Sequence, residues 1–378
     1  MNEPNRRLRI AFVIHDYNRH LGQGRYVAEL ASRFRADHDV HVFANRFEEP
    51  DAAGITYHHV PAWRPNALAT ILSFAIPATA MARGPFDIVH AQGLCGLRHD
   101  VATAHFCRAG WDEALARLRG RPTWRQALAK LLVTPLERFA LAARSTRRVI
   151  AVSGRIRDEL ERYYGRRDGV RVIYHGVDLD AFHPRNRERF RGVIRADLGV
   201  REGECLALYA GDLQKGAAAA IRATARVPGV RLVLVSGSDP AADRAVARAE
   251  GVADRVVFRP YSRQVERYFA AADVFLFPTL YDAYGMVISE AMAAGLPVVT
   301  SRAAGASELI EHGRDGWLTA DPWDRDQVAE GLQALARDSD LRARMGEAAR
   351  STIERYTWDR AASETLSVYR EISREARR

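Results

Sequence analysis

Two carboxylates, a glycine and the start of a helix stand close together in the second half of the chain. Asp282 precedes Glu290 by eight positions, and Gly285 lies between them where a helix can begin. The first N–H groups of a helix have no partner within it, so those of Gly285, Met286 and Val287 would face outward and attract an anion. Glu290, about one turn further, would reach hydroxyl groups through charge-assisted hydrogen bonds. These residue types predict a site for a diphosphate linked to a sugar.

A glycine-rich turn at residues 209–216 is the second segment that can do chemistry. It follows an apolar run, opens a helix and contains Lys215. The chain has 56 basic residues, and of these only Lys130 and Lys215 are lysines. A lysine in a chain that otherwise uses arginine suits a site that needs a compact ammonium group rather than a planar fork. An ordinary surface lysine at a helix-starting turn is the alternative.

The elements that must hold these segments are short apolar runs separated by amphipathic helices. The runs predict parallel strands at 8–14, 40–43, 86–90, 100–104, 147–153 and 170–173, and then at 206–210, 230–235, 255–258, 273–278 and 297–300. This alternation is typical of right-handed βαβ units, and it predicts two doubly wound α/β halves joined through residues 175–184. Ligands of such sheets bind beyond the carboxyl ends of the strands, where both segments lie. Two such halves facing each other would form a cleft, a usual place for a ligand.

The segment 277–300 resembles the acid-x7-acid motif of retaining glycosyltransferases with the GT-B fold, glycosyltransferase family 4. Residues 290–298 read Glu-Ala-Met-Ala-Ala-Gly-Leu-Pro-Val and match the second half of that motif. The resemblance implies that Asp282 holds hydroxyls of the transferred sugar and that Glu290 holds the nucleotide ribose. Asp282 is one methylene shorter than the glutamate usual in the family. The turn that meets the diphosphate and ribose would be Gly285, Met286, Val287 and Ile288.

The turn 209–216 resembles the family's Gly-Arg-Leu and Lys-Gly pattern, in which the cations neutralise the leaving diphosphate. The resemblance makes Lys215 a catalytic residue, and the matching glycines of the donor site are Gly211 and Gly216. Asp212 stands where the family has arginine. Because an acid would repel a diphosphate, we expect Asp212 to point away and another cation to replace the missing one.

Four residues in the first half take expected roles from the same family. Gly22 and Gly24 follow the first strand and permit close approach of the backbone to a ligand, and Arg25 adds a cation at a helix start. A plain tight turn would explain the glycines equally well. His105 follows a strand where the family has a histidine near the reacting sugar. An interior histidine with satisfied hydrogen bonds is the alternative.

Two further similarities concern the base of the nucleotide and the end of the chain. Arg259 and Tyr261 follow a predicted strand where the family places the base, largely through backbone contacts. The final helix, residues 358–378, resembles a helix that returns to the first domain in this family. The resemblances together span about residues 8–320, and the base identity is not encoded in side chains here.

The basic charge is concentrated in the first half of the chain. The sequence has 378 residues and a formal net charge of +9, with 30 basic and 20 acidic residues in 1–190 but 26 and 27 in 191–378. Residues 114–157 hold 11 basic residues and one acid, interleaved with Trp124 and several leucines. This segment predicts an anionic partner, either a membrane surface or a lipid-phosphate-linked acceptor. A solvated helix face is the alternative.

Together these features predict domains at 1–178 and 185–356 and a helix at 357–378 that packs on the first domain. The function expected is that of a hexosyltransferase-type retaining enzyme that moves a sugar from a nucleoside-diphosphate sugar to a glycan or lipid-linked acceptor in cell-surface polysaccharide or lipopolysaccharide assembly. A GT-B-fold epimerase or a basic nucleic-acid-binding protein are the alternatives, although no nucleic-acid-binding signature is present. No cofactor or metal is expected. The three cysteines have no metal-ligand spacing, and the first apolar run is too short for a signal peptide. Both features favour a cytoplasmic location, with contact to the inner face of the membrane.

Overall fold

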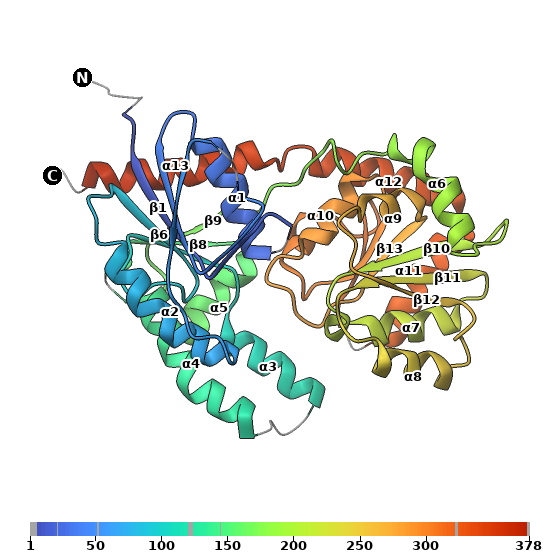
Figure 1. Cartoon of the computed structure of the whole chain (residues 1–378). Coiled ribbons are helices and arrows are strands. Elements are labelled where there is room, and N and C mark those ends of the chain that lie inside the picture. Colours follow the sequence, from blue (N-terminus) through green and yellow to red (C-terminus); the bar gives the residue numbers. More distant parts are fainter. Residues whose placement is uncertain are drawn as a thin grey trace. The chain divides into compact units, whose positions relative to one another are not determined.

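Short runs of Val, Ile, Leu, Ala and Phe build two separate parallel sheets, and each sheet belongs to its own compact unit. The computed structural model describes residues 6–20, 22–50, 53–119, 124–143, 145–321 and 324–375. Unit 1 comprises residues 1–175 and 358–378, and unit 2 comprises residues 176–357 (Figure 1). The predicted α/β class with two doubly wound halves is therefore confirmed.

Unit 1 is built on a seven-stranded sheet in the order β5-β3-β1-β6-β7-β8-β9, and all neighbouring strands are parallel. Its strands are β1 (Arg9–Val13), β3 (Asp39–Ala44), β5 (Ile55–His59), β6 (Ile88–Gln92), β7 (Val101–Ala104), β8 (Arg148–Ala151) and β9 (Val170–Val172). A separate parallel pair is formed by β2 (Asp16–Asn18) and β4 (Arg46–Glu48). The helices are α1 (Gly22–Phe34), α2 (Ala67–Met81), α3 (Arg108–Arg119), α4 (Trp124–Ala142), α5 (Gly154–Tyr164) and α13 (Trp358–Glu375).

Alternate side chains of β1 face two different apolar layers. Ala11 and Val13 point into a cluster with Phe74 of α2, while the Phe12 ring stacks against Phe34 of α1. Figure 1 accordingly shows α1 and α13 on one face of the sheet and α2 and α4 on the other. Burial on both faces explains why the strands are apolar without alternation.

The last helix, α13, is fixed to unit 1 by residues spaced three and four apart. Its buried residues recur with helical spacing and include Trp358 and Tyr369. The Tyr369 hydroxyl lies 2.6 Å from His90 Nδ1, and Arg33 of α1 donates to Asp359 at 2.6 Å. The helix therefore packs on the first-half domain although it follows the whole of unit 2 in the chain.

Unit 2 is built on a six-stranded parallel sheet in the order β12-β11-β10-β13-β14-β15. Its strands are β10 (Cys205–Ala210), β11 (Val230–Ser236), β12 (Val256–Pro260), β13 (Val274–Phe277), β14 (Val298–Ser301) and β15 (Trp317–Thr319). The α-helices are α6 (Asn186–Asp197), α7 (Ala217–Arg226), α8 (Ala241–Ala249), α9 (Glu266–Ala271), α10 (Met286–Ala293), α11 (Arg325–Arg337) and α12 (Ser339–Ile353), with 3₁₀ turns η1 (Leu213–Lys215) and η2 (Gly305–Leu309).

Helices cover both faces of the unit 2 sheet. Helices α7, α8 and α11 pack together on one face, and α6 with α9 and α10 with α12 pack on the other (Figure 1). Residues 176–184, predicted as a connection, belong to unit 2. The Val177 N–H donates to the Tyr356 carbonyl, and Arg350 of α12 donates to the Leu179 and Phe182 carbonyls.

Candidate functional site

Four neighbouring strands of unit 2 bring three of the predicted site residues, Tyr261, Lys215 and Asp282, to one edge of the sheet. Because β12, β11, β10 and β13 are adjacent and parallel, their carboxyl ends share that edge. The loops that leave it carry Tyr261, Ser238, Lys215 and Asp282, in that order across the sheet. Ligands of doubly wound sheets bind at this edge.

Lys215 and Asp282, two of the predicted catalytic residues, are in direct contact. Lys215 Nζ lies 2.6 Å from Asp282 Oδ2, and the side chains are 33% and 12% exposed, respectively. Asp282 is also held by its backbone, since its N–H donates to the Ala303 carbonyl and its carbonyl accepts from the Gly305 N–H. The pair therefore places an ammonium group beside a carboxylate of fixed position.

The turn that carries Lys215 fits closely against the loop after β13. A Cβ atom on Gly216 would lie 2.3 Å from the Pro278 carbonyl oxygen, so only glycine fits there. The Leu280 N–H donates to the Lys215 carbonyl at 2.8 Å. Gly211, with φ of +133°, starts the turn in a conformation that favours glycine. These contacts fix the backbone of Lys215 relative to Asp282.

Asp212, the acid in the place of the family's arginine, caps the η1 turn. Its Oδ1 accepts hydrogen bonds from the Gln214 N–H at 3.0 Å and from the Ser238 hydroxyl at 3.1 Å. The Tyr209 hydroxyl donates to the Asp212 carbonyl at 2.7 Å. The carboxylate thus stabilises the turn, which gives Asp212 a structural reason to differ from the family pattern.

The start of α10 offers unpaired N–H groups next to Asp282. Gly285 has φ of +91° and precedes the first residue of the helix. Within the described part of the chain, the N–H groups of Gly285, Met286 and Val287 have no hydrogen-bond acceptor. The Ile288 N–H instead donates to the Gly285 carbonyl, and the Ile288 side chain is fully buried. The anion-binding potential therefore lies with the three residues before Ile288.

Glu290 and the two residues expected near the base differ in exposure. Glu290 is buried within α10 at 6% exposure, and Tyr261 is 44% exposed beyond the end of β12. The Arg259 guanidinium donates to the Asp197 carboxylate at 2.8 Å and to the Asp197 carbonyl, at the end of α6. The side chain of Arg259 is thus engaged in unit 2 packing.

In unit 1, His105 lies among aromatic rings. Its Nε2 donates to Gln92 Oε1 at 2.8 Å, and its ring meets the Tyr26 ring edge-on, with centroids 4.9 Å apart. Burial, with smaller effects of His175 and His90, lowers the pKa of His105 well below its usual value. His105 is therefore neutral near pH 7, and it can orient a partner by hydrogen bonding but does not carry charge.

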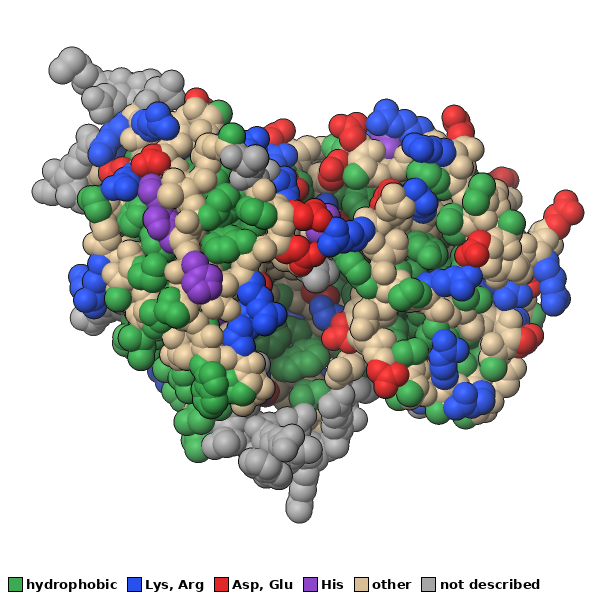
Figure 2. All heavy atoms as spheres, viewed as in Figure 1, with side chains coloured by type: hydrophobic (Ala, Val, Ile, Leu, Met, Phe, Trp, Pro, Cys, Tyr) green, Lys and Arg blue, Asp and Glu red, His purple; other side chains and the backbone are tan. Residues whose placement is uncertain are grey.

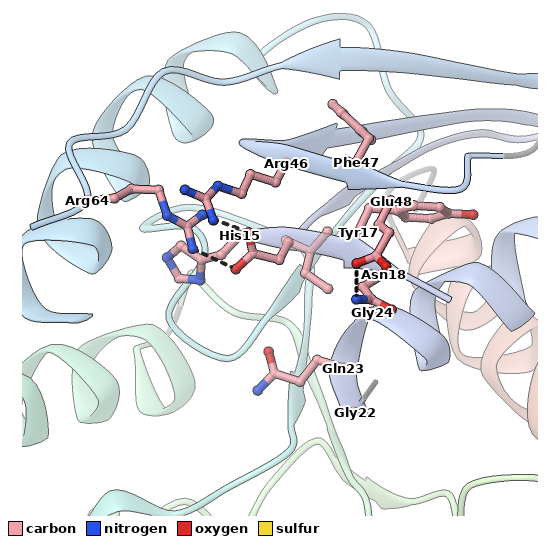
Figure 3. Close-up of a pocket in the computed structure, with 12 residues that line it drawn as sticks. His15, Tyr17, Asn18, Gly22, Gln23, Gly24, Arg46, Phe47, Glu48 and Arg64 are labelled. Atoms are coloured by element: carbon pink, nitrogen blue, oxygen red, sulfur yellow. Dashed lines mark hydrogen bonds and ion pairs between the residues drawn. The ribbon is translucent and has the colours of Figure 1, made fainter. Parts of the chain in front are cut away.

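The glycines at the start of α1 line a pocket of about 820 Å³ in unit 1 (Figure 3). A Cβ atom on Gly24 would lie 2.5 Å from the backbone N and O of Asn18, so this glycine is required by packing. Gly22, with φ of +44°, stands at the exposed start of the helix. Arg25 is not among the residues that line this pocket, and its charge helps to lower the pKa of His175.

The charged residues of this pocket were not singled out from the sequence. Arg64 binds the two carboxylate oxygens of Asp16 at 2.7 and 3.0 Å (Figure 3), and this hydrogen bonding raises the pKa of Arg64. Arg46 is exposed at the pocket and has no ion-pair partner among the described residues. Burial lowers the pKa of His15 to about 4. The sequence does not indicate that Asp16 and Arg46 lie side by side, because they belong to β2 and β4, which are three-residue strands without a recognisable pattern.

The described residues contain no group of three or more His, Cys, Asp or Glu placed to hold a metal ion. Within the same residues, the helices are all too short or too polar to span a lipid bilayer. Of the basic segment 114–157, residues 120–123 and 144 and the side chain of Trp124 lie outside the part of the chain that the structure describes.

Comparison with known families and proteins gives matches along most of the chain. The family "Glycosyltransferase Family 4" matches residues 21–181, and "Glycosyl transferases group 1" matches residues 190–352. A D-inositol 3-phosphate glycosyltransferase of Acidothermus cellulolyticus is 30% identical over 93% of this chain and 86% of its own length. The corresponding enzyme of Streptomyces avermitilis is 36% identical over 59% of this chain, and the match spans about half (51%) of that enzyme.

Solved structures with the same fold also cover nearly the whole chain. WaaG, described as a glycosyltransferase involved in lipopolysaccharide biosynthesis, superposes with a TM-score of 0.77 at 24% identity, covering 94% of this chain and 99% of WaaG. A HepE protein of Anabaena, solved with UDP-glucose, has a TM-score of 0.71 at 21% identity and covers 95% of this chain and 99% of its own. These similarities establish the fold of the two units.

Proposed function

Because the chain belongs to glycosyltransferase family 4 and has the GT-B fold, we propose that it transfers a sugar from a nucleoside-diphosphate sugar to a hydroxyl group of a glycan or lipid-linked acceptor, with retention of configuration. The proposal rests on one observation. Lys215, Asp282 and the unpaired N–H groups before Ile288 stand together at the carboxyl edge of the unit 2 sheet. Such an arrangement suits a ligand that joins a diphosphate to a polyhydroxylated ring.

In the proposed reaction the bond between the sugar's anomeric carbon and the diphosphate oxygen breaks. The bond to the acceptor oxygen forms on the same face of the sugar, and a leaving-phosphate oxygen takes the acceptor proton. Negative charge grows on the diphosphate as its bond breaks, so Lys215 and the N–H groups of Met286 and Val287 stabilise the transition state more than the bound donor. Asp282 would bind sugar hydroxyls, and Glu290 the ribose. A contact of His105 with the sugar stays a prediction.

We propose that no resident metal takes part, because Lys215 and the helix N-terminus already supply positive charge at the diphosphate. Initial rates are then expected to stay unchanged when EDTA replaces added Mg²⁺. A large loss of rate on chelation would contradict this part of the proposal.

The pocket of unit 1 is the proposed acceptor side. Its lining combines the exposed Arg46, the Arg64–Asp16 pair and Gln23, which suits a polar acceptor with an anionic group. Relatives are named for phosphorylated compounds: a D-inositol 3-phosphate glycosyltransferase, and an alpha-maltose-1-phosphate synthase of Mycolicibacterium smegmatis that is 29% identical over 97% of this chain and 100% of its own. We therefore include a phosphorylated sugar or cyclitol beside lipid-linked glycans as acceptors to test.

Contact with an anionic membrane surface is proposed for unit 1. Trp63, Ile76 of α2 and Leu131 of α4 are 71%, 67% and 70% exposed, and Lys130 and Arg138 are exposed on α4. Figure 2 shows hydrophobic side chains gathered over α2 and α4. Apolar side chains interleaved with cations suit a lipid interface. Liposome flotation at low salt should show binding that requires anionic lipid, and equal recovery with and without such lipid would end this proposal.

A thermal-shift panel of UDP-, GDP-, ADP- and dTDP-sugars tests the donor class. One nucleotide family is expected to raise the melting temperature of the wild type and to do so less in the Lys215→Ala variant. Analysis of products with the selected donor then separates the alternatives, because a glycosyltransferase requires an acceptor and forms a glycoside. An epimerase would release free nucleotide or a new sugar without any acceptor.

A further inference from the structure

A pocket of unit 2 lies at the opposite edge of the sheet from Lys215. It has a volume of about 520 Å³ and is lined by Asp273 and Pro297, which directly precede β13 and β14. The donor-site residues instead follow the carboxyl ends of the strands. The two sites are therefore separated by the length of the sheet, and a ligand in this pocket would not occupy the donor site.

Four arginines line this pocket, from two different helices. Arg187 and Arg191 belong to α6, and Arg342 and Arg350 belong to α12. Arg350 donates to carbonyl groups and forms an ion pair with Glu354. The pocket thus concentrates positive charge although the second half of the chain has no net basic excess.

Most of these arginines have internal partners. Arg191 binds Asp273 at 2.5 Å and donates to the carbonyls of Ala271 and Ala272. Asp273 accepts a second arginine, Arg195, at 2.8 Å. Arg342 donates to carbonyls at the end of α11. Both carboxylate oxygens of Asp273 are therefore engaged, one by Arg191 and the other by Arg195.

Of the four arginines of this pocket, Arg187 is the one without such a partner in the described part of the chain. Its side chain is partly buried, and its guanidinium has no hydrogen bond or ion pair among the described residues. Burial, followed by the charge of Arg191, lowers the pKa of Arg187 from its usual value. Asp273 acts on this pKa in the opposite direction, but its carboxylate already binds Arg191 and Arg195. A partly buried guanidinium beside these arginines therefore favours a bound anion.

The four arginines lie at different points along the two helices. Arg187 is the second residue of α6, and Arg342 lies in the first turn of α12, from which the pocket lining continues along α12 to Arg350. Glu347 is the one acid on its exposed rim, and in the described part of the chain it forms no ion pair with these arginines.

We propose that this pocket is a second anion site, which takes the phosphate group of a small phosphate monoester through the Arg187 guanidinium. A guanidinium forms two parallel hydrogen bonds to a phosphate, and a pocket of about 520 Å³ accommodates a phosphorylated monosaccharide. The site does not depend on the transferase reaction.

Isothermal titration of the full chain with inorganic phosphate and with glucose 6-phosphate, at constant ionic strength in chloride, tests the proposal. Arg187→Gln is expected to weaken binding about 10- to 100-fold, since a hydrogen bond to a charged group contributes about 1.5–3 kcal/mol. Arg189→Gln is the matched control, because Arg189 is exposed on the same helix and lies over Phe190 outside the pocket. Arg187→Gln should melt at the same or a higher temperature in chloride, as it removes an uncompensated charge.

Two further variants separate this site from the donor site. Lys215→Ala should keep the phosphate binding that Arg187→Gln weakens. Glu347→Gln should tighten this binding a few-fold by removing the rim carboxylate. Equal affinity of wild type, Arg187→Gln and Arg189→Gln would overturn the proposal. So would the loss of all phosphate binding in Lys215→Ala, because that result would leave a single anion site in unit 2.

Discussion

Replacing Lys215 by alanine removes the cation that we assign to the leaving diphosphate. Loss of one positioned donor to a developing oxyanion costs about 2.7–4 kcal/mol in well-studied enzymes. At about 1.36 kcal/mol per factor of ten, kcat should fall by two to three orders of magnitude. The effect on KM should be smaller, because the charge on the diphosphate grows only as its bond to the sugar breaks.

Folding of this variant should be nearly unaffected. The Lys215–Asp282 pair is partly exposed, and ion pairs near the surface contribute about 0.2–1 kcal/mol. Asp282 keeps the hydrogen bond from the Tyr284 N–H and both backbone hydrogen bonds. The loss in kcat would then report on chemistry rather than on the amount of folded protein.

The assay follows release of nucleoside diphosphate from the donor that the thermal-shift panel selects, with circular dichroism to verify folding. Arg222→Ala is the matched control, since Arg222 pairs with Glu250 at 3.3 Å in the same unit at a similar exposure of 30%. This control should retain wild-type kcat. The reasoning is refuted if Lys215→Ala turns over the true donor at a near-normal rate, or if both variants lose activity equally.

Three other predictions concern stability. Gly216→Ala should destabilise unit 2 by about 1–3 kcal/mol in urea denaturation, because the added Cβ would meet the Pro278 carbonyl. The control Gly192→Ala, in the exposed face of α6, should be neutral or slightly stabilising, and equal effects of the two variants would contradict the close fit. Tyr369→Phe should destabilise unit 1 by about 1–3 kcal/mol by leaving His90 Nδ1 unpaired, and an unchanged urea midpoint would argue against this hydrogen bond. Unit 1 should lose stability as pH falls from about 6.5 toward 4, because burial lowers the pKa values of four of its histidines, His15, His90, His99 and His175. Each of these histidines contributes up to about 1.4 kcal/mol per pH unit. Calorimetry at pH 7.5 and 5 should show the melting transition of unit 1 falling more than that of unit 2.

The sequence predicted those strands that are buried on both faces, because they form continuous apolar runs. Strands β1, β10 and β13 lie within one or two residues of their predicted bounds. Strand β5 reads Ile-Thr-Tyr-His-His and is polar because it is an edge strand with part of its surface exposed. Helix α6 was not among the predicted elements. Its apolar residues Phe190, Val193 and Ile194 recur at helical spacing, but the stripe is short and none of the helix's residues is fully buried.

The residues of the proposed donor site could be singled out from the sequence, but the contact between Lys215 and Asp282 could not. Lys215 and Asp282 are 67 positions apart, and they meet because β10 lies beside β13 in the sheet. The order of strands in a sheet leaves no local pattern in the sequence. The same holds for Arg187 and Arg342, which are brought together by α6 and α12 and have no shared motif. Asp212 was expected to point away from the diphosphate, and the capping of η1 supplies the reason that sequence alone lacked.

A crystal structure of the full chain with the selected nucleoside diphosphate bound is the most direct measurement of the central claim. We expect a phosphate oxygen within hydrogen-bonding distance of Lys215 Nζ and of the N–H group of Met286 or Val287. A diphosphate seated elsewhere, for example against Arg187, or no nucleotide bound at millimolar concentration, would contradict it.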